Sequence, residues 1–533
     1  MDVNNILHTA SMFHRTGNYE DAELLYRRIL EYYPDNIHVL NYLGNVLQDQ
    51  QKYDQALGCY QRAMQLNPAF AGSYYHLGAL FETVDKCERA IEYYEKAIQL
   101  DSHFAGSFNN LGNVYRKLGR LDEAIPYFQK TIEIQPQFWG SYYNLGEVYQ
   151  AQVRDEEAID TYLKALQLNP HHVPSMNNLA VLMMARKQFD EALRYCEEAI
   201  HVNPEYGEPH LTKAMIQLLL GQFEEGWKEY EWRWKTRDAE AWQRKCDKPL
   251  WNGMPTQNKT LLIWAEQGIG DEIMFASCIP DVMSLIGSCV IECDKRLVPL
   301  FSRSFPQAEI LERRRGDDPV GMAQQTMHSY DLVIAAGSLP VHLRPRVSSF
   351  PNAEAFLLSD KGKVAEWKKR MRTLPAGLRV GISWRGGKDP RERKIRSVDM
   401  ALWKDILHIK GVSFINLQYD TSEKEIDEIR DALGITVYHW LDADPLKDLD
   451  TSAAQIAALD LVISVDNATV HLAGALGVPV WTLLPYSPNW RWMLDREDTP
   501  WYPSMKLFRQ PTFGDWETVM EVVCHELENM VQG

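Results

Sequence analysis

Prolines and small residues recur with a spacing of 34 residues through roughly the first 200 residues of the chain. Five prolines and one serine mark the grid, at Pro34, Pro68, Ser102, Pro136, Pro170 and Pro204. A glycine or alanine follows each grid position, usually after a leucine, and a second small residue comes later in the period. Two antiparallel helices approach closely only where small side chains face each other, and a proline ends the second helix. The pattern therefore predicts helix pairs that stack into one curved solenoid.

This pattern resembles the tetratricopeptide repeat, which has a period of 34 residues. Six clear repeats and a degenerate seventh are predicted over residues 1–236 as an all-α solenoid. Asn110, Asn144 and Asn178 occupy the same position in three repeats, and a similar ladder lines the repeats of nucleocytoplasmic O-linked N-acetylglucosamine transferases. Their amides either bind the backbone of an acceptor protein or tie one repeat to the next. The sequence leaves both interpretations open.

The pattern changes after residue 236. Residues 237–257 are predicted to be a linker, and short apolar runs then alternate with helical segments, which is typical of parallel α/β sheets. Two Rossmann-like lobes are predicted, at 258–375 and 376–533, the second closed by a terminal helix. The predicted strands are KTLLIWAE, CVIECD and YDLVIAAG in the first lobe, and LRVGISW, VSFINLQY, ITVYHW, LDLVISVD and PVWTLLP in the second. Ligands bind such sheets at the carboxyl ends of the strands.

A glycine-rich turn, EQGIGDE, follows the first predicted strand. Gly268 and Gly270 allow a tight turn and a close approach of the main chain to a ligand. Asp271 then lies at the start of a helix, where an acidic residue serves either as a cap or as a group in catalysis.

A second candidate site is the strand-to-helix segment LDLVISVDNATVHLAGALGVPVW. Asp466 and Asn467 are predicted to cap its helix, whose first amides, at Asn467, Ala468 and Thr469, favour a nucleotide diphosphate. His471 lies one turn further on and is a further candidate residue for binding this nucleotide.

A basic loop follows the strand LRVGISW in an otherwise acidic protein. Arg385, Lys388, Arg396 and Ser397 are its candidate phosphate ligands, although a solvated run of charges has the same composition. A later segment dense in tryptophan and arginine, residues 488–503, is not assigned a role.

Together, EQGIGD, the WRG…RS segment, the strand-to-helix segment and WRWMLDREDTPWYPSMKLFRQ resemble the heptosyltransferase-like branch of GT-B glycosyltransferases preceded by tetratricopeptide repeats. The resemblance implies that Asp271 is the general base and that Asp466 contacts the nucleotide sugar. It implies that Asn467, Ala468 and Thr469 hold the diphosphate through their amides, and that Arg385, Lys388 or Arg396 offsets the charge of the leaving group. Inverting displacement follows, with no metal or other cofactor beyond the nucleotide-sugar co-substrate.

Two positions depart from the pattern of that branch. The late motif has Asn467 where threonine is usual, and the basic loop lacks an aspartate shortly before Arg396 and Ser397. Asp442-Ala443-Asp444 matches the metal signature of another transferase fold, and we interpret the match as coincidental.

Charge and composition narrow the remaining possibilities. The formal net charge of -17 disfavours nucleic acid as a partner, because phosphate contacts need clustered Lys and Arg. The eight cysteines have no zinc-type spacing, and neither a leader nor a membrane span is recognised, so a cytoplasmic protein without membrane insertion is expected. The leading hypothesis is a glycosyltransferase acting on a protein bound by the repeats. The alternatives are a lipid-linked or polysaccharide acceptor, and a non-catalytic scaffold.

Overall fold

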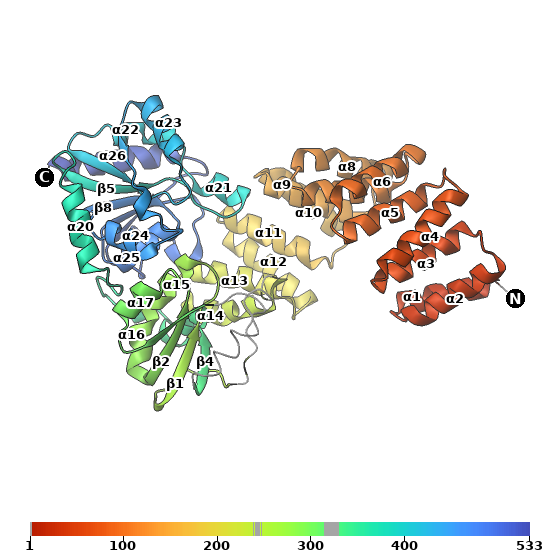
Figure 1. Cartoon of the computed structure of the whole chain (residues 1–533), viewed down its shortest axis with the longest axis horizontal. Helices are drawn as coiled ribbons and strands as arrows, with labels where there is room; N and C mark the ends of the chain where they lie inside the picture. Colours follow the sequence, from red (N-terminus) through yellow and green to blue (C-terminus); the bar gives the residue numbers. More distant parts are fainter. Residues whose placement is uncertain (1–2, 238, 240–245, 247, 314–329, 533) are drawn as a thin grey trace. The chain divides into compact units, whose positions relative to one another are not determined.

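The computed structural model describes residues 3–237, 239, 246, 248–313 and 330–532. The chain divides into two compact units, Met1–Leu179 and Ala180–Gly533, and each is described by itself (Figure 1).

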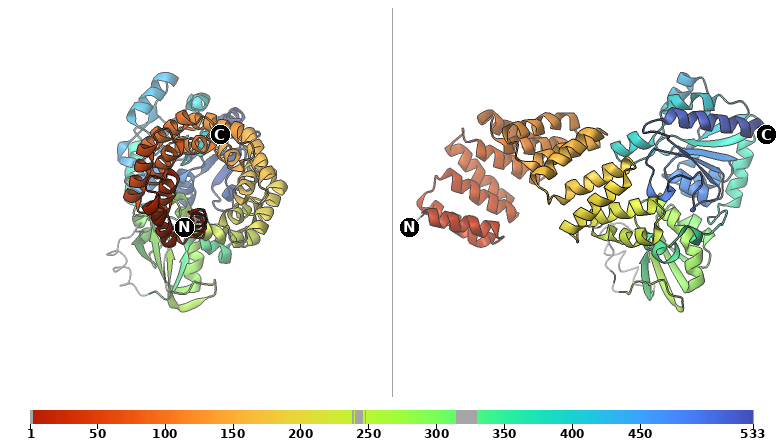
Figure 2. Two further views of the ribbon diagram at one scale, coloured as in Figure 1. Left: turned by 90° about the vertical axis from the view of Figure 1, so that its right-hand side faces the viewer. Right: turned by 180° about the vertical axis from the view of Figure 1, so that it is seen from behind.

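The first unit is an all-α array of antiparallel helix pairs, which Figure 2 shows stacked side by side. Consecutive helices pack against one another throughout the unit, as the repeat pattern predicts. The helices are α1 (Val3–Arg15), α2 (Tyr19–Tyr32), α3 (Ile37–Asp49), α4 (Tyr53–Leu66), α5 (Ala71–Thr83), α6 (Cys87–Leu100), α7 (Ala105–Lys117), α8 (Leu121–Ile134), α9 (Trp139–Ala151) and α10 (Asp155–Leu168), followed by α11 (Val173–Ala185) at the boundary of the units.

Glycine recurs in the first helix of a repeat because an aromatic ring of the second helix lies directly against it. A β-carbon on Gly44 would lie 2.3 Å from the Tyr60 ring, and one on Gly78 would lie 2.7 Å from the Tyr94 ring. In the sixth repeat the glycine position is Ala180, and the aromatic position holds the smaller Cys196. The two positions therefore change size together.

The second unit begins with the last helices of the repeat pattern: α12 (Phe189–Val202), α13 (Gly207–Leu219), α14 (Phe223–Tyr230) and the 3-10 helix η1 (Glu231–Lys235). The seventh repeat thus belongs to the compact unit that contains the sheets, although its sequence period assigns it to the array. Residues 238, 240–245 and 247 of the predicted linker 237–257 lie outside the described residues, and its last two residues already belong to the first strand.

The first sheet is parallel, with strand order β3-β2-β1-β4. Strand β1 lies between β2 and β4, and its Ile263 is in register with Ile291 of β2 and with Ile334 of β4. Its elements are β1 (Thr256–Trp264), α15 (Ile269–Phe275), α16 (Ile279–Leu285), β2 (Ile286–Cys293), α17 (Val298–Ser304), β3 (Glu309–Glu312), β4 (Leu332–Ala335) and α19 (Leu339–Leu343), and α20 (Lys361–Met371) leads to the second sheet.

The second sheet is also parallel, with order β10-β9-β8-β5-β6-β7. In chain order this is the 3-2-1-4-5-6 arrangement of doubly wound dinucleotide-binding folds, and the first sheet has the corresponding order for four strands. Its elements are β5 (Leu378–Ser383), α21 (Pro390–Arg396), α22 (Lys404–Leu407), β6 (Val412–Asn416), α23 (Glu423–Leu433), β7 (Val437–Tyr438), α24 (Leu449–Ile456), β8 (Leu461–Val465), α25 (Ala468–Ala475), β9 (Val480–Leu484), β10 (Met505–Arg509) and α26 (Trp516–Gln532).

One hydrophobic core joins the seventh repeat to both sheets. Trp227 of α14 lies within this core. Its ring packs edge-on against Trp490, with 5.3 Å between the ring centroids, and its Nε1 donates a hydrogen bond to the Arg344 carbonyl at 2.9 Å. Trp501 packs in the same cluster. The aromatic segment 488–503, which the sequence leaves without a role, therefore anchors the repeat to the α/β part. Among the described residues, we find no helix with the length and apolar character needed to cross a membrane.

Candidate functional site

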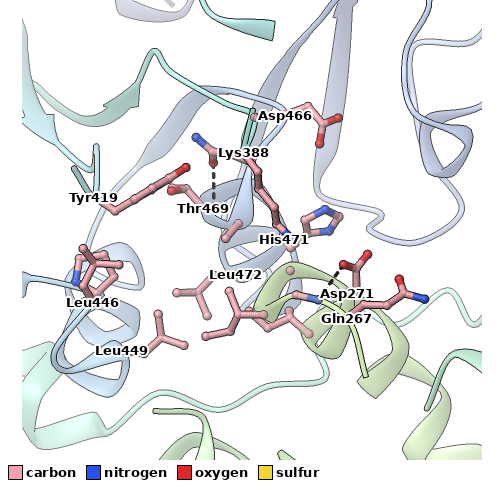
Figure 3. Close-up of a pocket in the computed structure, with 18 of the residues that line it drawn as sticks. Gln267, Asp271, Lys388, Tyr419, Leu446, Leu449, Asp466, Thr469, His471 and Leu472 are labelled. Atoms are coloured by element: carbon pink, nitrogen blue, oxygen red, sulfur yellow. Dashed lines mark hydrogen bonds between the residues drawn. The ribbon is translucent and has the colours of Figure 1, made fainter. Parts of the chain in front are cut away.

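A cavity of about 740 Å³ opens at the carboxyl ends of strands from both sheets (Figure 3). Its walls are the turn between β1 and α15, the loop after β5, the N-terminus of α25, the ends of β6 and β7, and α13 with η1 of the seventh repeat. β5 and β8 are neighbours in the second sheet. The strand that follows β5 in the chain, β6, pairs on one side of this pair, and the strand that follows β8, β9, pairs on the other. Doubly wound sheets bind ligands at such a point.

Asp271 lies in the first turn of α15 on the cavity wall (Figure 3). Its Oδ2 accepts a hydrogen bond from the Gly268 backbone N–H at 3.2 Å, and its Oδ1 forms an ion pair with Arg491. The side chain is 19% exposed. Asp271 therefore caps its helix and also presents a carboxylate to the cavity.

The two glycines of this turn serve close packing. The left-handed backbone angle belongs to Gln267, with φ 61°, whereas Gly268 has φ -97°. A β-carbon on Gly270 would lie 3.1 Å from His471 Cδ2 and 3.7 Å from Ala468 Cα. The expectation that glycine makes the tight turn is thus corrected, because Gly270 instead lets α15 approach the start of α25.

Asp466 is a buried carboxylate, 1% exposed, at the end of β8. Its Oδ2 lies 2.9 Å from Arg396 Nη2, and its carbonyl oxygen accepts from the same nitrogen at 2.7 Å. Within the described chain, neither carboxylate oxygen has a hydrogen bond of normal geometry. Burial raises the pKa of Asp466, but the charges of Arg396 and Arg491 outweigh it and hold that pKa below its ordinary value.

The first turn of α25 begins at the cavity, with Asn467 as its cap. The Asn467 Oδ1 accepts from the Thr469 N–H at 2.9 Å, while its Nδ2 donates to Ser383 Oγ and the Arg385 carbonyl. The Thr469 amide is therefore engaged within the chain, contrary to the expectation that it holds an anion. Ala468, Thr469 and Asn467 all line the cavity. An asparagine at this position ties the ends of β5 and β8 together.

The candidate basic residues fall into two groups. Lys388 and Arg396 line the cavity, and a β-carbon on Gly268 would lie 3.5 Å from Lys388 Nζ. The Arg385 guanidinium lies instead against Asp420, at 2.9 Å, and Glu425. Ser397 Oγ accepts from the Gly386 N–H at 3.3 Å. These two therefore hold the loop in shape, and neither is part of the cavity wall.

His471 lies between the two aspartates, 4% exposed (Figure 3). Its Nδ1 is 2.9 Å from the Tyr502 hydroxyl, and its ring stacks on Trp492. Burial, with the charge of Arg491 adding to it, lowers the pKa of His471 to about 4. The imidazole is therefore neutral at pH 7.

Arg491 is a cavity residue that the sequence analysis did not identify. It lies in the 3-10 helix η8 (Trp490–Trp492), with its guanidinium carbon 5.0 Å from the Trp490 ring centroid. The only sequence signal is one arginine between two tryptophans. That signal gives no indication that the side chain reaches Asp271.

The seventh repeat forms the wall beside Asp271. Leu211 and Met215 of α13 line the cavity, as do Tyr230 and Arg233. Tyr230 and Gln267 are hydrogen-bonded through their side chains at 2.7 Å. The buried Arg233 guanidinium donates to both oxygens of Glu266, at 2.9 and 2.8 Å. Glu266 of the glycine-rich turn is thus paired within the chain and joins the repeat to the turn.

The far end of the cavity is apolar and aromatic. Tyr419, Leu446 and Leu449 lie there, away from Asp271 (Figure 3). Asp444 also lines this end, and its Oδ2 lies 3.1 Å from Lys447 Nζ. Asp442, the other acid of the DAD triplet, pairs with Arg370 at 2.7 Å. No group of three or more His, Cys, Asp or Glu side chains is placed to hold a metal ion in the described ranges.

The three asparagines of the array donate hydrogen bonds within the first unit. Asn110 Nδ2 donates to the Tyr75 and Tyr94 hydroxyls at 3.2 Å, Asn144 Nδ2 to Asn109 Oδ1 at 3.2 Å, and Asn178 Nδ2 to the Tyr162 hydroxyl at 3.0 Å. Each bond reaches the preceding repeat. The tie between repeats is therefore observed, and the peptide clamp stays a prediction.

Comparison with known families identifies the repeats. Models described as "Tetratricopeptide repeat" match residues 5–36, 71–104, 105–138, 140–172 and 175–203, and one described as "TPR repeat" matches 44–84. The protein FlbA of Caulobacter vibrioides is 36% identical over 313 residues, which are 57% of this chain and 52% of FlbA. The chain thus spans about half the length of that relative.

Solved structures similar to this chain include repeat proteins. The crystal structure of MamA is 28% identical, covering 30% of this chain and 94% of MamA with a TM-score of 0.27. YrrB, described as a TPR protein with an unusual peptide-binding site, is 21% identical, covering 34% and 95% with a TM-score of 0.30. The sequence matches establish that the N-terminal part of the chain is an array of tetratricopeptide repeats.

Proposed function

We propose that this protein is a GT-B glycosyltransferase that moves a sugar from a nucleotide-sugar donor to a hydroxyl of a polypeptide. The observation that carries the proposal is the meeting, in one cavity, of Asp271 from the first sheet with Asp466 and Arg396 from the second. The N-terminus of α25 lies beside them, where its dipole favours negative charge.

The donor fits the cavity in one direction. A planar base suits the apolar and aromatic end near Tyr419 and Leu449, and the diphosphate then reaches the start of α25 with Arg396 and Lys388. Asp466 Oδ1 has no hydrogen-bond partner among the described residues and suits a hydroxyl group of a sugar, while Oδ2 is paired with Arg396. This order places the anomeric carbon towards Asp271.

The reaction is a single displacement. Asp271 takes the proton of the acceptor hydroxyl, whose oxygen bonds to the anomeric carbon as the bond from that carbon to the diphosphate oxygen breaks. The departing electron pair stays on the diphosphate, stabilised by the cations and the helix terminus. One displacement inverts the anomeric configuration.

A polypeptide acceptor is favoured over a lipid-linked or polysaccharide acceptor by the repeat wall. Leu211 and Met215 occupy positions at which the preceding repeats mostly carry polar residues, such as Asn41, Asn45 and Asn109. The same face of the repeat thus turns apolar where it borders the cavity. An extended segment beside the reacting hydroxyl explains that change.

The donor class is tested by thermal unfolding in the presence of nucleoside diphosphates and nucleotide sugars. Binding to the folded state alone adds about 2.7 kcal/mol at a hundredfold excess over Kd. One nucleotide should raise Tm in wild type and in the exposed control Asp427→Asn, and should lose its effect in Asp466→Asn. No shift with any nucleotide in wild type would overturn the proposal in favour of a scaffold.

Transfer is tested with that donor, radiolabelled in the sugar, and a library of serine- and threonine-containing peptides. Asp271→Asn should lower transfer by about 10²–10⁴-fold without weakening nucleotide binding. Leu211→Arg should abolish labelling of peptides and keep nucleotide binding, whereas Leu220→Arg, at an exposed end of α13, should change neither. Labelling of lipid-linked or polysaccharide acceptors alone would refute the polypeptide assignment.

A further inference from the structure

Arg491 is held rigidly at its backbone and contacts a single acidic group by hydrogen bond. Trp490 and Trp492 on either side of it are buried, and its own side chain is 11% exposed. The guanidinium pairs with Asp271, while the buried Nε has no hydrogen-bond partner among the described residues. The guanidinium therefore has unused donors at the cavity wall.

The pairing leaves Asp271 with both oxygens engaged. Oδ2 accepts from the Gly268 N–H, and Oδ1 is paired with Arg491. A general base must accept the acceptor's proton on one of these oxygens. Each oxygen keeps a second lone pair, but Arg491 competes with the acceptor hydroxyl for Oδ1, and opening the ion pair frees that oxygen.

The two ion pairs between an arginine and a candidate aspartate, Arg396 with Asp466 and Arg491 with Asp271, differ in how readily they can separate. Arg396 makes two contacts with Asp466, one to the carboxylate and one to the carbonyl oxygen. Among the described residues, the Arg491 side chain forms an ion pair only with Asp271, a carboxylate that is itself part exposed. A diphosphate brings additional negative charge and matches a guanidinium with paired oxygens. Of these two arginines, Arg491 is the one that the diphosphate can draw away from its partner.

We propose that Arg491 is shared between Asp271 and the donor diphosphate. Without donor it neutralises Asp271, and with donor it moves to the diphosphate and frees Asp271 Oδ1 for the acceptor hydroxyl. This inference rests on the proposed function and makes Arg491 a donor-binding residue that also controls the base. Donor binding thereby precedes release of the base.

The test is a double-mutant cycle of nucleoside diphosphate affinity by calorimetry, using the diphosphate that raises Tm. Arg491→Met should weaken binding by about 10- to 100-fold, because a charged hydrogen-bond donor to the phosphate is lost. Asp271→Asn should tighten binding several-fold, because the competitor for Arg491 is gone. In the double variant, the effect of Asp271→Asn should vanish.

Control variants distinguish competition for Arg491 from a general change of charge near the cavity and from misfolding. Arg496→Met removes a nearby arginine that pairs with Asp498 outside the cavity wall, and binding should not change. Arg491→Lys retains the charge and should bind more tightly than Arg491→Met, with the Tm of the unliganded protein checked for each variant. Tightening by Asp271→Asn to the same extent with and without Arg491, or no tightening at all, would overturn the inference alone. No binding of any nucleoside diphosphate by wild type would overturn the proposed function as well.

Discussion

Replacing Glu266 by glutamine is expected to destabilise Ala180–Gly533 by about 3 kcal/mol, at the lower end of the range for breaking a buried ion pair. The Glu266 side chain is 2% exposed and the Arg233 side chain 6% exposed. Glu266 accepts two hydrogen bonds from Arg233 and one from the Gly337 N–H at 2.8 Å. Glutamine keeps one acceptor oxygen but removes the buried counter-charge, which leaves the Arg233 charge with only the part-exposed Glu231, at 2.6 Å, as its ion-pair partner.

The loss is measurable by thermal unfolding. An unfolding entropy of about 2.1 cal/mol/K per residue gives roughly 0.7 kcal/mol/K for a unit of this length, so Tm falls by about 4 °C. Tryptophan fluorescence reports this transition, because Trp234 lies against Arg233, with the guanidinium carbon 4.5 Å from the ring centroid. Glu225→Gln, at an exposed site of α14, is the matched control and should shift stability by less than about 0.5 kcal/mol.

A second substitution tests the cause. Adding Arg233→Met removes the buried charge and leaves the glutamine oxygen for Gly337, so at least half of the lost stability should return. A double variant that is no more stable than Glu266→Gln would refute the reasoning that the loss of the buried counter-charge of Arg233 is responsible. It would assign the loss to packing at the end of the repeat instead.

Three further results are expected. Gly58→Ala should stabilise the first unit by up to about 1 kcal/mol, because no atom lies within 4 Å of the new β-carbon. Gly44→Ala in the same repeat should destabilise the unit, because its β-carbon overlaps the Tyr60 ring. Urea unfolding of both variants measures the two effects, and equal effects would contradict the packing explanation. The pKa of His471 is lowered from 6.5 to about 4, so its contribution to stability is complete above pH 6.5 and is lost as the pH falls towards 4. Between pH 6.5 and 4, the free energy of unfolding of His471→Asn should therefore fall by about 3 kcal/mol less than that of wild type. Parallel curves of unfolding free energy against pH for the two proteins would exclude a buried neutral histidine. Asn144→Ala should lower the stability of the array by about 0.5–1.5 kcal/mol, since the bond to Asn109 is lost, and an unchanged urea midpoint would argue against a role in tying repeats.

Local pattern was sufficient for most secondary structure. The repeat helices follow from small residues at a fixed period, and eight predicted strands coincide with β1, β2, β4, β5, β6, β7, β8 and β9. Of the strands in the described part of the chain, β3 and β10 do not follow from the sequence pattern, and both are edge strands. Their sequences, EILE and MKLFR, mix charged and apolar residues, so neither forms an apolar run.

The candidate site was predicted only in part. The motifs next to strand ends predict five site residues that all line the same cavity: Asp271, Asp466, Lys388, Arg396 and His471. The same pattern predicts Arg385, but a basic residue pairs with whichever acids the fold brings near, and here those acids are Asp420 and Glu425. Composition does not specify such pairings.

The sequence by itself determined the repeat array, the two α/β lobes and the strand ends that carry polar residues, because each is encoded by spacing within tens of residues. Tertiary structure alone decided that the seventh repeat shares the core of the sheets, that Arg233 neutralises Glu266, and that Arg491 meets Asp271 across 220 positions of sequence. These contacts depend on how separately folded elements pack and on which charges burial forces together. No periodicity along the chain records that information.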